Sequence, residues 1–317
     1  MPSQAIRQGA HRHIEAATEL TIVIPYFEGS HREPVHQLSE ALRSVVAQTV
    51  DLSRLEVVLV QDGGTDNLRP LLTQFAPLNV RLLRRERNAG LSAARNMGAS
   101  AASSENLLFL DADDRLPSHC VARVLKEFAR NPSWDLCFSN SLKFDSEMRA
   151  PLRVIDSSQY YDLFRNYGMS RLNPVFHAIF VGHCIAMRTT AFRAVGGFDI
   201  SLDCGEITAL VLAAFVSGLR IGYIDDILYN YRDNPLGLSK SPRLFSKRIG
   251  SIARYYEMAF AERLSRIEAR GRIEPFHHFH FDLYDGDGRR VDLPYIDYEH
   301  QRIRNITNEV AQLCGQS

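Results

Sequence analysis

The chain has 317 residues, of which 45% are hydrophobic and 23% are charged, and its 37 Lys and Arg residues balance 37 Asp and Glu residues. This composition is typical of a globular protein with a sizeable core. The balanced charge argues against a nucleic-acid partner and against general attraction to an anionic membrane, so any anionic ligand must be bound by a local site.

The first 20 residues contain no segment of the signal-peptide type, and the longest nearly apolar run, Ile207 to Val216, is too short to cross a bilayer. The five cysteines are odd in number and lack the paired spacing of metal sites. Scattered thiols of this kind are typical of a reducing compartment. The sequence therefore predicts a cytoplasmic protein.

Short β-rich runs alternate with helical patterns from residue 19 onward. The runs cover residues 21–24, 55–60, 80–83, 106–110 and 134–138. Between the first two, apolar residues recur at helical spacing behind Pro34, which is tolerated in the first turn of a helix. The strand starts lie about 25 to 35 residues apart, the length of a strand plus a crossover helix. The pattern predicts an α/β protein with a parallel, doubly wound sheet.

The fourth run leads directly into three carboxylates, Asp111, Asp113 and Asp114. If strand geometry persists, the side chains of Asp111 and Asp113 leave the same face, and two hard oxygen donors suit a divalent cation such as Mg²⁺ or Mn²⁺. A cation held by so few carboxylates keeps coordination sites for phosphate oxygens. The alternative is that these aspartates only end the strand and cap the helix that starts near Pro117.

Unusual polar clusters also follow the first three runs, at residues 25–28, 61–66 and 84–90. Open parallel sheets bind their ligands at the carboxyl ends of the strands. Since all four clusters are expected at one edge of the sheet, we interpret them as one ligand site rather than as unrelated turns.

Five segments, in this order, resemble the family 2 glycosyltransferases of the GT-A fold. They are Ile24–Glu28, Val60–Asp66, Asn88–Gly98, Phe109–Asp114 and Val195–Asp199. The resemblance covers roughly residues 20 to 235 and implies a Rossmann-like, doubly wound, mostly parallel sheet. It divides the domain into a nucleotide-sugar half, residues 20–140, and an acceptor half, residues 141–239, after an N-terminal arm of residues 1–19.

The resemblance implies a role for several of these side chains. Asp62 would hydrogen-bond the base, usually uracil, and Asp111 and Asp113 of the Asp-x-Asp motif would carry a Mg or Mn ion that bridges the pyrophosphate. Arg95 would face the nucleotide or its phosphates, since a guanidinium fork suits phosphate and the helix N-terminus adds partial positive charge. Further nucleotide-sugar contacts would come from Pro25, Tyr26, Glu28, Asn88, Gly90, Ala112 and His183.

Three of these roles have a structural alternative. Arg95 would otherwise be a surface arginine, Asp62 a turn residue and His183 a core histidine. Gln61 stands where the family often has an acid, which weakens the inference about base preference.

The catalytic base is where the chain departs from this family. After Phe198 and Asp199 the family usually has a Glu-Asp pair at the start of a helix, and an acid there serves as base. Here the pair is Glu206-Ile207. Glu206 is the candidate base and Asp203 the reserve candidate. The alternative is a capping box, with Asp203 as N-cap and Glu206 three residues on.

The resemblance does not extend to residues 240–317, so only the residue pattern is informative there. Apolar residues at helical spacing over 243–270 predict an amphipathic helix that packs on the catalytic domain, forms a homodimer or lies on a membrane surface. Phe279–Tyr284 and Val291–Leu293 flank a turn sequence and predict a hairpin, on which His278 and His280 share a face and are more readily structural than metal ligands. A terminal helix would follow.

Together these features predict an inverting, metal-dependent hexosyl- or N-acetylhexosaminyltransferase. It would move a sugar from a UDP-sugar donor to a hydroxyl of a carbohydrate, lipid-linked or small-metabolite acceptor. The alternative is a nucleotide-sugar-binding partner or regulator without transferase activity. A dehydrogenase is disfavoured because no Gly-x-Gly-x-x-Gly follows the first strand, and a Walker phosphate loop is also absent from the sequence.

Overall fold

The computed structural model describes residues 18–30, 33–158, 183–202 and 205–235, together with four short strands between residues 268 and 284. Most of the predicted N-terminal arm, Asp203, most of the predicted helix over 243–270 and the predicted terminal helix lie outside the described residues.

An eight-stranded sheet forms the centre of the molecule, in the order β3-β2-β1-β4-β7-β5-β6, with β8 also paired to β5. Its strands are β1 (Leu20–Tyr26), β2 (Leu55–Asp62), β3 (Val80–Arg85), β4 (Asn106–Phe109), β5 (Leu136–Phe144), β6 (Pro151–Ile155), β7 (Ile185–Arg188) and β8 (Ile221–Arg232). The first four strands pair in parallel, which confirms the predicted sheet.

The second half of the sheet is mixed rather than parallel. Strand β7 lies between β4 and β5 and is antiparallel to both, whereas β8 runs parallel to β5. The predicted strand over 134–138 begins at Leu136 and continues to Phe144, across the boundary placed at residue 140. The two predicted halves of the domain therefore share one sheet.

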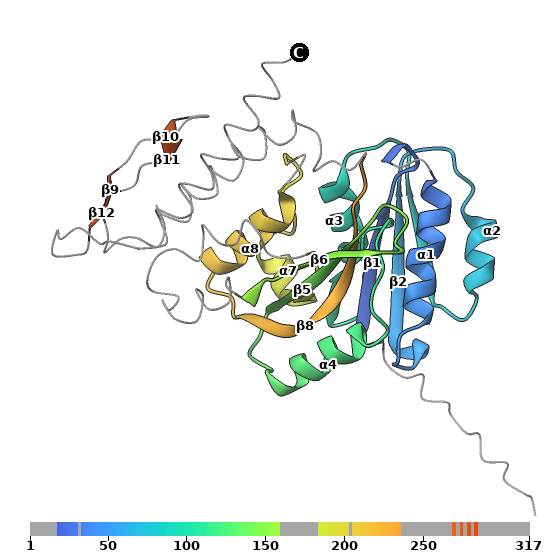
Figure 1. The fold of residues 1–317 in the computed structure, drawn as a ribbon, viewed down its shortest axis with the longest axis horizontal. Coiled ribbons are helices and arrows are strands. Elements are labelled where there is room, and N and C mark those ends of the chain that lie inside the picture. Colours follow the sequence, from blue (N-terminus) through green and yellow to red (C-terminus); the bar gives the residue numbers. More distant parts are fainter. Residues whose placement is uncertain are drawn as a thin grey trace, which may run out of the picture.

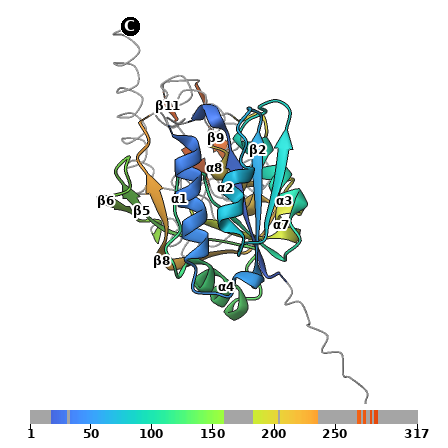
Figure 2. The same ribbon diagram turned by 90° about the vertical axis from the view of Figure 1, so that its right-hand side faces the viewer.

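Helices cover both faces of this sheet, and the alternation of side chains along β1 shows why. Ile22 and Ile24 join the core cluster that contains Leu38 and Leu42 of α1, whereas Val23 joins the cluster that contains α3, α7 and α8 side chains. Figures 1 and 2 both place α1 and α2 on the same side of the sheet. The helices are α1 (Pro34–Val46), α2 (Arg69–Leu72), α3 (Leu91–Ala101), α4 (Cys120–Arg130), α7 (Thr189–Ala194) and α8 (Glu206–Val216), and the short 3-10 helices are η1 (Glu28–Ser30), η2 (Leu52–Arg54) and η3 (Thr73–Phe75).

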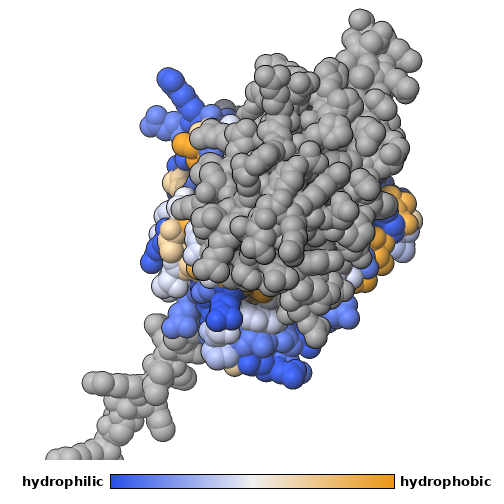
Figure 3. Space-filling view, turned by 90° about the vertical axis from the view of Figure 1, so that its left-hand side faces the viewer, coloured by the Kyte–Doolittle hydropathy of each residue, from blue (hydrophilic) through white to orange (hydrophobic). Residues whose placement is uncertain are grey.

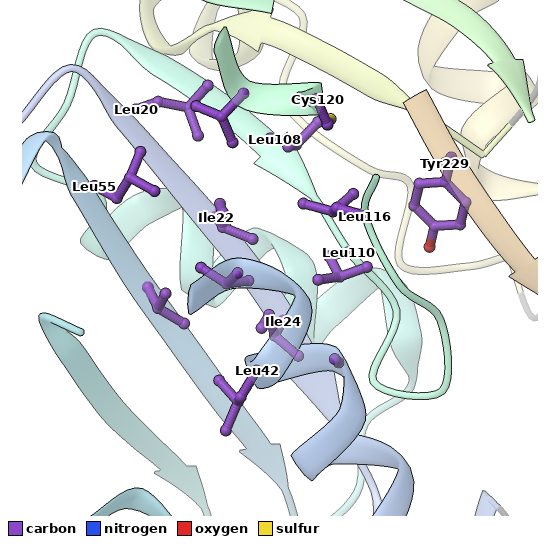
Figure 4. Packing of buried hydrophobic residues seen from close by; sticks show 14 of the residues in the cluster. Leu20, Ile22, Ile24, Leu42, Leu55, Leu108, Leu110, Leu116, Cys120 and Tyr229 are labelled. Carbon is purple, nitrogen blue, oxygen red and sulfur yellow. The ribbon is translucent and has the colours of Figure 1, made fainter. Parts of the chain in front are cut away.

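Close packing fixes the position of α3, the helix that carries Arg95. A Cβ atom added to Gly98 would lie 2.4 Å from Cγ1 of Val23 on β1, so a larger residue there would push the helix away from the sheet. On the opposite face, Ile22, Ile24, Leu108 and Leu110 pack together, and Tyr229 projects from β8 beside the segment that follows β4 (Figure 4). Each fully buried leucine or isoleucine contributes about 1.5–3 kcal/mol.

One prediction for the C-terminal region is corrected. Glu268–Arg270 forms strand β9 rather than the end of a helix, and it pairs antiparallel with β12 (Asp282–Tyr284). Inside this pair, β10 (Ile273–Glu274) pairs with β11 (His278–Phe279). The sequence shows helix breakers here, Gly271 and Pro275, and closing such short nested loops costs little chain entropy. Val291–Leu293, the predicted hairpin partner of β12, lies outside the described residues.

The described surface on the face shown in Figure 3 is mostly hydrophilic, with small apolar patches. Among the residues that the structure describes, no helix has both the length and the hydropathy needed to cross a membrane.

Candidate active site

The loops that follow β1 and β2 are joined to one another. The Glu28 carboxylate accepts hydrogen bonds from the backbone N–H groups of Thr65 (2.8 Å) and Asp66 (2.9 Å), and the Tyr26 hydroxyl donates to Asp66. An open depression of about 540 Å³ lies beside them and is lined by Glu28, Glu33, Pro34, Val35, His36, Thr65 and Asp66. The predicted contacts Tyr26 and Glu28 therefore lie at one edge of the sheet.

Asp62 is a buried carboxylate at the last position of β2 and not a turn residue. Its oxygens accept the backbone N–H groups of Ala89 (3.1 Å) and Gly90 (2.8 Å), and Nε of Arg85 lies 2.9 Å away. Asp62 thus anchors the loop that opens α3, a task that the sequence did not predict. Its predicted contact with the nucleotide base remains a prediction.

The aspartates after β4 do not continue the strand, so the expectation of strand geometry is wrong. Strand β4 ends at Phe109, and a turn closes between the Asp114 N–H and the carbonyl oxygen of Asp111 (3.1 Å). The N–H of Asp111 donates to the hydroxyl of Tyr229 (3.0 Å) rather than to a backbone carbonyl of a neighbouring strand. The capping alternative is also wrong, because α4 begins at Cys120 behind His119, with no side-chain cap.

Strand β8 holds the turn of residues 111–114, the carboxylate turn, in place. The backbone N–H of Arg232 donates to the Asp114 carboxylate (2.7 Å), and its Nε donates to the Asp113 carbonyl oxygen (2.6 Å). Its remaining nitrogens bind the Ser146 carbonyl oxygen and Glu40, each within 2.7 Å. Burial, together with the charges of Asp113 and Asp111, raises the pKa of Asp114 well above its usual value. Asp114 therefore acts as a buried anchor of the turn.

Sequence reasoning missed Tyr229, Arg232 and Asn234. Tyr229 and Arg232 each contact the turn across 118 residues of sequence, and Asn234 Nδ2 lies 3.4 Å from an oxygen of Asp113. The only available signal was an arginine at the end of an alternating apolar strand, which is a weak indication of a buried ion pair.

Asp111 and Asp113 have the donor chemistry for a hard divalent cation. Both offer carboxylate oxygens, and the Asp111 side chain is 22% exposed. In the described part of the chain, no cluster of three or more His, Cys, Asp or Glu side chains has the arrangement of a metal site. A site with at most two protein carboxylates suits Mg²⁺ or Mn²⁺, which keep waters and bind phosphate oxygens.

Arg95 lies at the centre of the site and is not a surface arginine. It is 2% exposed, its Nη2 donates to Asp111 Oδ1 (2.5 Å), its Nη1 donates to Glu206 Oε1 (2.6 Å), and its guanidinium lies over the Phe198 ring. Burial opposes a charge here, but Asp111 and Glu206 outweigh it and raise the pKa of Arg95. Arg95 is therefore a fixed cation between two carboxylates.

Glu206 is the first residue of α8, and the capping-box alternative is wrong. Gly205 has φ +85°, outside the helical region, and its carbonyl oxygen accepts the first helical hydrogen bond from Ala209 (3.0 Å). Gly205 is thus the N-cap and Glu206 the next position, whereas a capping box needs Glu two positions further on. Ile207 packs against the apolar cluster under α8. Asp203 lies outside the described residues.

The other predicted contacts lie around this centre. Pro25 and Ala112 are buried, Asn88 is exposed, and Gly90 is the N-cap of α3. The His183 ring stacks on Tyr231 of β8, with ring centroids 4.1 Å apart. The structure therefore joins Asp111, Arg95 and Glu206 directly and places the other described residues on neighbouring strand ends and loops.

Comparison with known proteins identifies the family. The model of glycosyl transferase family 2 matches residues 21–196, more than half of the chain. The uncharacterised glycosyltransferase EpsJ of Bacillus subtilis is 27% identical over 231 residues, which are 70% of this chain and 63% of EpsJ. Glycosyltransferase GlyA of Streptococcus pneumoniae is 29% identical over 236 residues, which are 70% of this chain and 32% of GlyA. The chain thus spans less than two thirds of these relatives.

Solved structures confirm the expected GT-A fold. Residues 1–349 of S. aureus TarS in complex with UDP-GlcNAc match with a TM-score of 0.59 at 18% identity, over 75% of this chain and 66% of that one. The mannosyltransferase PcManGT of Pyrobaculum calidifontis, in complex with GDP-Man and Mn²⁺, matches with a TM-score of 0.55 at 17% identity, over 77% of this chain and 70% of that one. With its family model, relatives and fold in agreement, the chain belongs to glycosyl transferase family 2.

Proposed function

We propose that this chain is an inverting, metal-dependent glycosyltransferase that uses a nucleotide-diphosphate sugar, with UDP-sugar as the preferred donor, and a hydroxyl-bearing acceptor. The observation that carries the proposal is the cluster of Asp111, Arg95 and Glu206, joined at the carboxyl edge of the sheet of a family 2 chain. Two solved structures of similar fold contain UDP-GlcNAc in one case and GDP-Man with Mn²⁺ in the other, which supports a sugar nucleotide as donor.

In the proposed donor complex, Asp62 accepts a hydrogen bond from the base, and the nucleoside lies toward the depression beside the ends of β1 and β2. Asp111 and Asp113 would hold the cation next to the diphosphate. A bound cation would supply positive charge that stabilises the diphosphate as it departs. Pro25, Tyr26, Glu28, Asn88, Gly90, Ala112 and His183 complete the proposed contacts.

In the chemical step, the acceptor oxygen forms a bond to the anomeric carbon from the face opposite the nucleotide. The bond from that carbon to the diphosphate oxygen breaks, and its electron pair leaves with the nucleotide. The hydroxyl proton passes to a carboxylate, for which Glu206 is the first candidate and Asp203 the second. Since Oε1 of Glu206 is occupied by Arg95, the proton would pass to Oε2.

UDP binding with and without a chelator tests this proposal. EDTA, or the substitution Asp113→Asn, should abolish tight UDP binding and turnover while the melting temperature stays nearly unchanged, because the residue lies in a turn after β4. Asp226→Asn is the matched control, because the Asp226 carboxylate contacts His119, Arg123 and the backbone N–H of Ile227 rather than residues of the site. Unchanged UDP affinity in EDTA would contradict metal-dependent binding.

A second candidate function follows from Ile207. The apolar side chain at this position, where the family usually has its second acid, favours a nucleotide-sugar-binding protein that acts as a partner or regulator. A mass-spectrometric screen of nucleotide sugars for binding and slow hydrolysis separates the two functions. Binding without turnover across a broad panel of acceptors would favour the regulator.

A further inference from the structure

Helix α3 holds both sides of the active site through two adjacent side chains. Arg95 binds Asp111 in the carboxylate turn and Glu206 at the start of α8. Asn96 binds the backbone of Phe198 twice, because its Nδ2 donates to the carbonyl oxygen (2.7 Å) and its Oδ1 accepts the N–H (2.8 Å). The segment from Phe198 to Glu206 is thus fastened to α3 at both ends.

The charges of this cluster cannot act independently. Arg95 is buried, and its guanidinium is shared between Asp111 and Glu206 at nearly equal distances, 2.5 and 2.6 Å. Two oppositely charged groups so close together in a partly dehydrated site interact strongly. A cation bound at Asp111 competes with Arg95 for the same carboxylate. Glu206 weakens the hold of Arg95 on Asp111, because it binds the other side of the guanidinium.

We propose that Arg95 is a positioning residue that couples the cation site at Asp111 to the carboxylate of Glu206. This inference rests on the proposed function. A cation bound at Asp111 would compete with Arg95 for that carboxylate and leave the guanidinium to Glu206, whose free oxygen would then be held toward the acceptor. Because such coupling is reciprocal, the charge of Glu206 must in turn favour cation binding, although Glu206 is not a cation ligand.

The test measures Mn²⁺ affinity in the presence of saturating UDP, by electron paramagnetic resonance of free Mn²⁺. Glu206→Gln keeps the shape and an acceptor for Arg95 but removes the charge, so Arg95 is left to Asp111 and Mn²⁺ affinity should fall by about fivefold or more. An affinity within twofold of that of the unaltered protein would overturn the inference.

Glu127→Gln is the matched control. The Glu127 side chain is 12% exposed and paired with Arg123, much as Glu206 is 11% exposed and paired with Arg95. Glu127 lies on α4, near the start of β4 rather than near the carboxylate turn that follows its end. Arg188 shows this position, because it binds both the carbonyl oxygen of Phe128, the neighbour of Glu127, and the side chain of Asn106, the first residue of β4. Its substitution should leave Mn²⁺ affinity unchanged.

A double-mutant cycle with Arg95→Gln distinguishes coupling through Arg95 from direct attraction between Glu206 and Mn²⁺. If the effect passes through Arg95, adding Glu206→Gln to Arg95→Gln changes Mn²⁺ affinity by less than twofold. An effect that persists or grows in this background overturns the inference. If Arg95→Gln fails to fold, Arg95→Lys replaces it with the same expectation, because a single ammonium cannot bridge both carboxylates as the fork does.

The same titration separates failure of this inference from failure of the proposed function. If the unaltered protein shows no Mn²⁺-dependent UDP binding, the proposed function is overturned and this inference with it. Normal binding by the unaltered protein, with no change in Glu206→Gln, would overturn the inference alone.

Discussion

The carboxylate of Asp62, at the end of β2, accepts a hydrogen bond from the backbone N–H of Gly90, 2.8 Å away at the N-cap of α3. Gly90 lies 28 residues further along the chain. Through this contact, the residue proposed to read the base also sets the start of the helix that carries Arg95. A substitution at Asp62 is therefore expected to disturb both the proposed base contact and the start of the helix that carries Arg95.

The first prediction is that UDP binds more tightly than GDP, ADP or CDP, and that Asp62→Ala removes the preference. A buried carboxylate that accepts the imide N–H of uracil disfavours bases with a different edge, at about 1–3 kcal/mol for a mispaired buried group. Asp62→Ala also leaves the N–H groups of Ala89 and Gly90 without their acceptor, so the free energy of unfolding should fall by about 1–3 kcal/mol.

Competition calorimetry with the four diphosphates measures the preference. The control is Arg85→Met, which removes a partner of Asp62 but leaves its carboxylate, and which should keep the preference for UDP. Equal affinities for the four nucleotides in the unaltered protein would reject the base assignment.

The second prediction concerns Tyr229, whose hydroxyl accepts the N–H of Asp111. Burial, with the charges of Asp114 and Asp111, raises the pKa of Tyr229, so the hydroxyl stays protonated. Tyr229→Phe leaves this N–H without its acceptor and should lower the free energy of unfolding by about 1–3 kcal/mol. Because the freed turn no longer holds Asp111 in place, the Kd of UDP in saturating Mn²⁺ should rise severalfold.

Tyr223→Phe is the control on the same strand, because the Tyr223 hydroxyl bonds Asp225 in an exposed position. Calorimetry in Mn²⁺ and in EDTA isolates the cation-dependent part of UDP binding. If Tyr229→Phe and Tyr223→Phe bind UDP equally well in Mn²⁺, Tyr229 has no role in holding the turn.

The third prediction is that Arg232→Met is severely destabilising. Arg232 is 3% exposed and binds Glu40, the Asp113 carbonyl oxygen and the Ser146 carbonyl oxygen through its guanidinium. Removing one partner of a buried ion pair costs about 3–5 kcal/mol, because the other charge remains buried. Chemical denaturation should show this loss.

The exposed pair of Arg54 and Glu19 is a matched comparison, because its shortest N–O distance, 2.6 Å, equals that of Arg232 and Glu40. Exposed pairs contribute only about 0–1 kcal/mol, so Arg54→Met should be mild. Similar losses for Arg54→Met and Arg232→Met would show that burial of the Arg232 network is unimportant.

The contrast between local and distant contacts explains how much of this site the sequence could predict. Strands β1 to β4 were predictable because each is a short apolar run between turn residues, and their parallel order places the polar clusters at one edge. The turn at Asp111 was not predictable, because it is held by the hydroxyl of Tyr229, which lies 118 residues away in the sequence. Contacts at such separation leave no local periodicity in the sequence.

The position of β7 was unpredictable for a similar reason. Residues 185–187 form a short apolar run that would suit several places in a sheet, and only packing inserts it between β4 and β5. The ion pairs of Arg95 were unpredictable for the same reason, because they join residues that are far apart in the sequence. The sequence predicted Arg95, Asp111 and Glu206 separately, but not that one guanidinium joins the other two.

The last prediction is that Glu206 is the base, and Glu206→Gln tests it at saturating Mn²⁺ and donor. Under these conditions any effect on cation affinity is removed, and loss of a general base should lower kcat by about 10² to 10⁴. Gln can still accept the hydrogen bond from Arg95, so the melting temperature should fall only slightly, as for the control Glu127→Gln. A near-normal kcat would leave Glu206 as a structural partner of Arg95 and make Asp203 the base candidate. If Asp203→Asn also retained full turnover, neither of these two carboxylates would be the catalytic base.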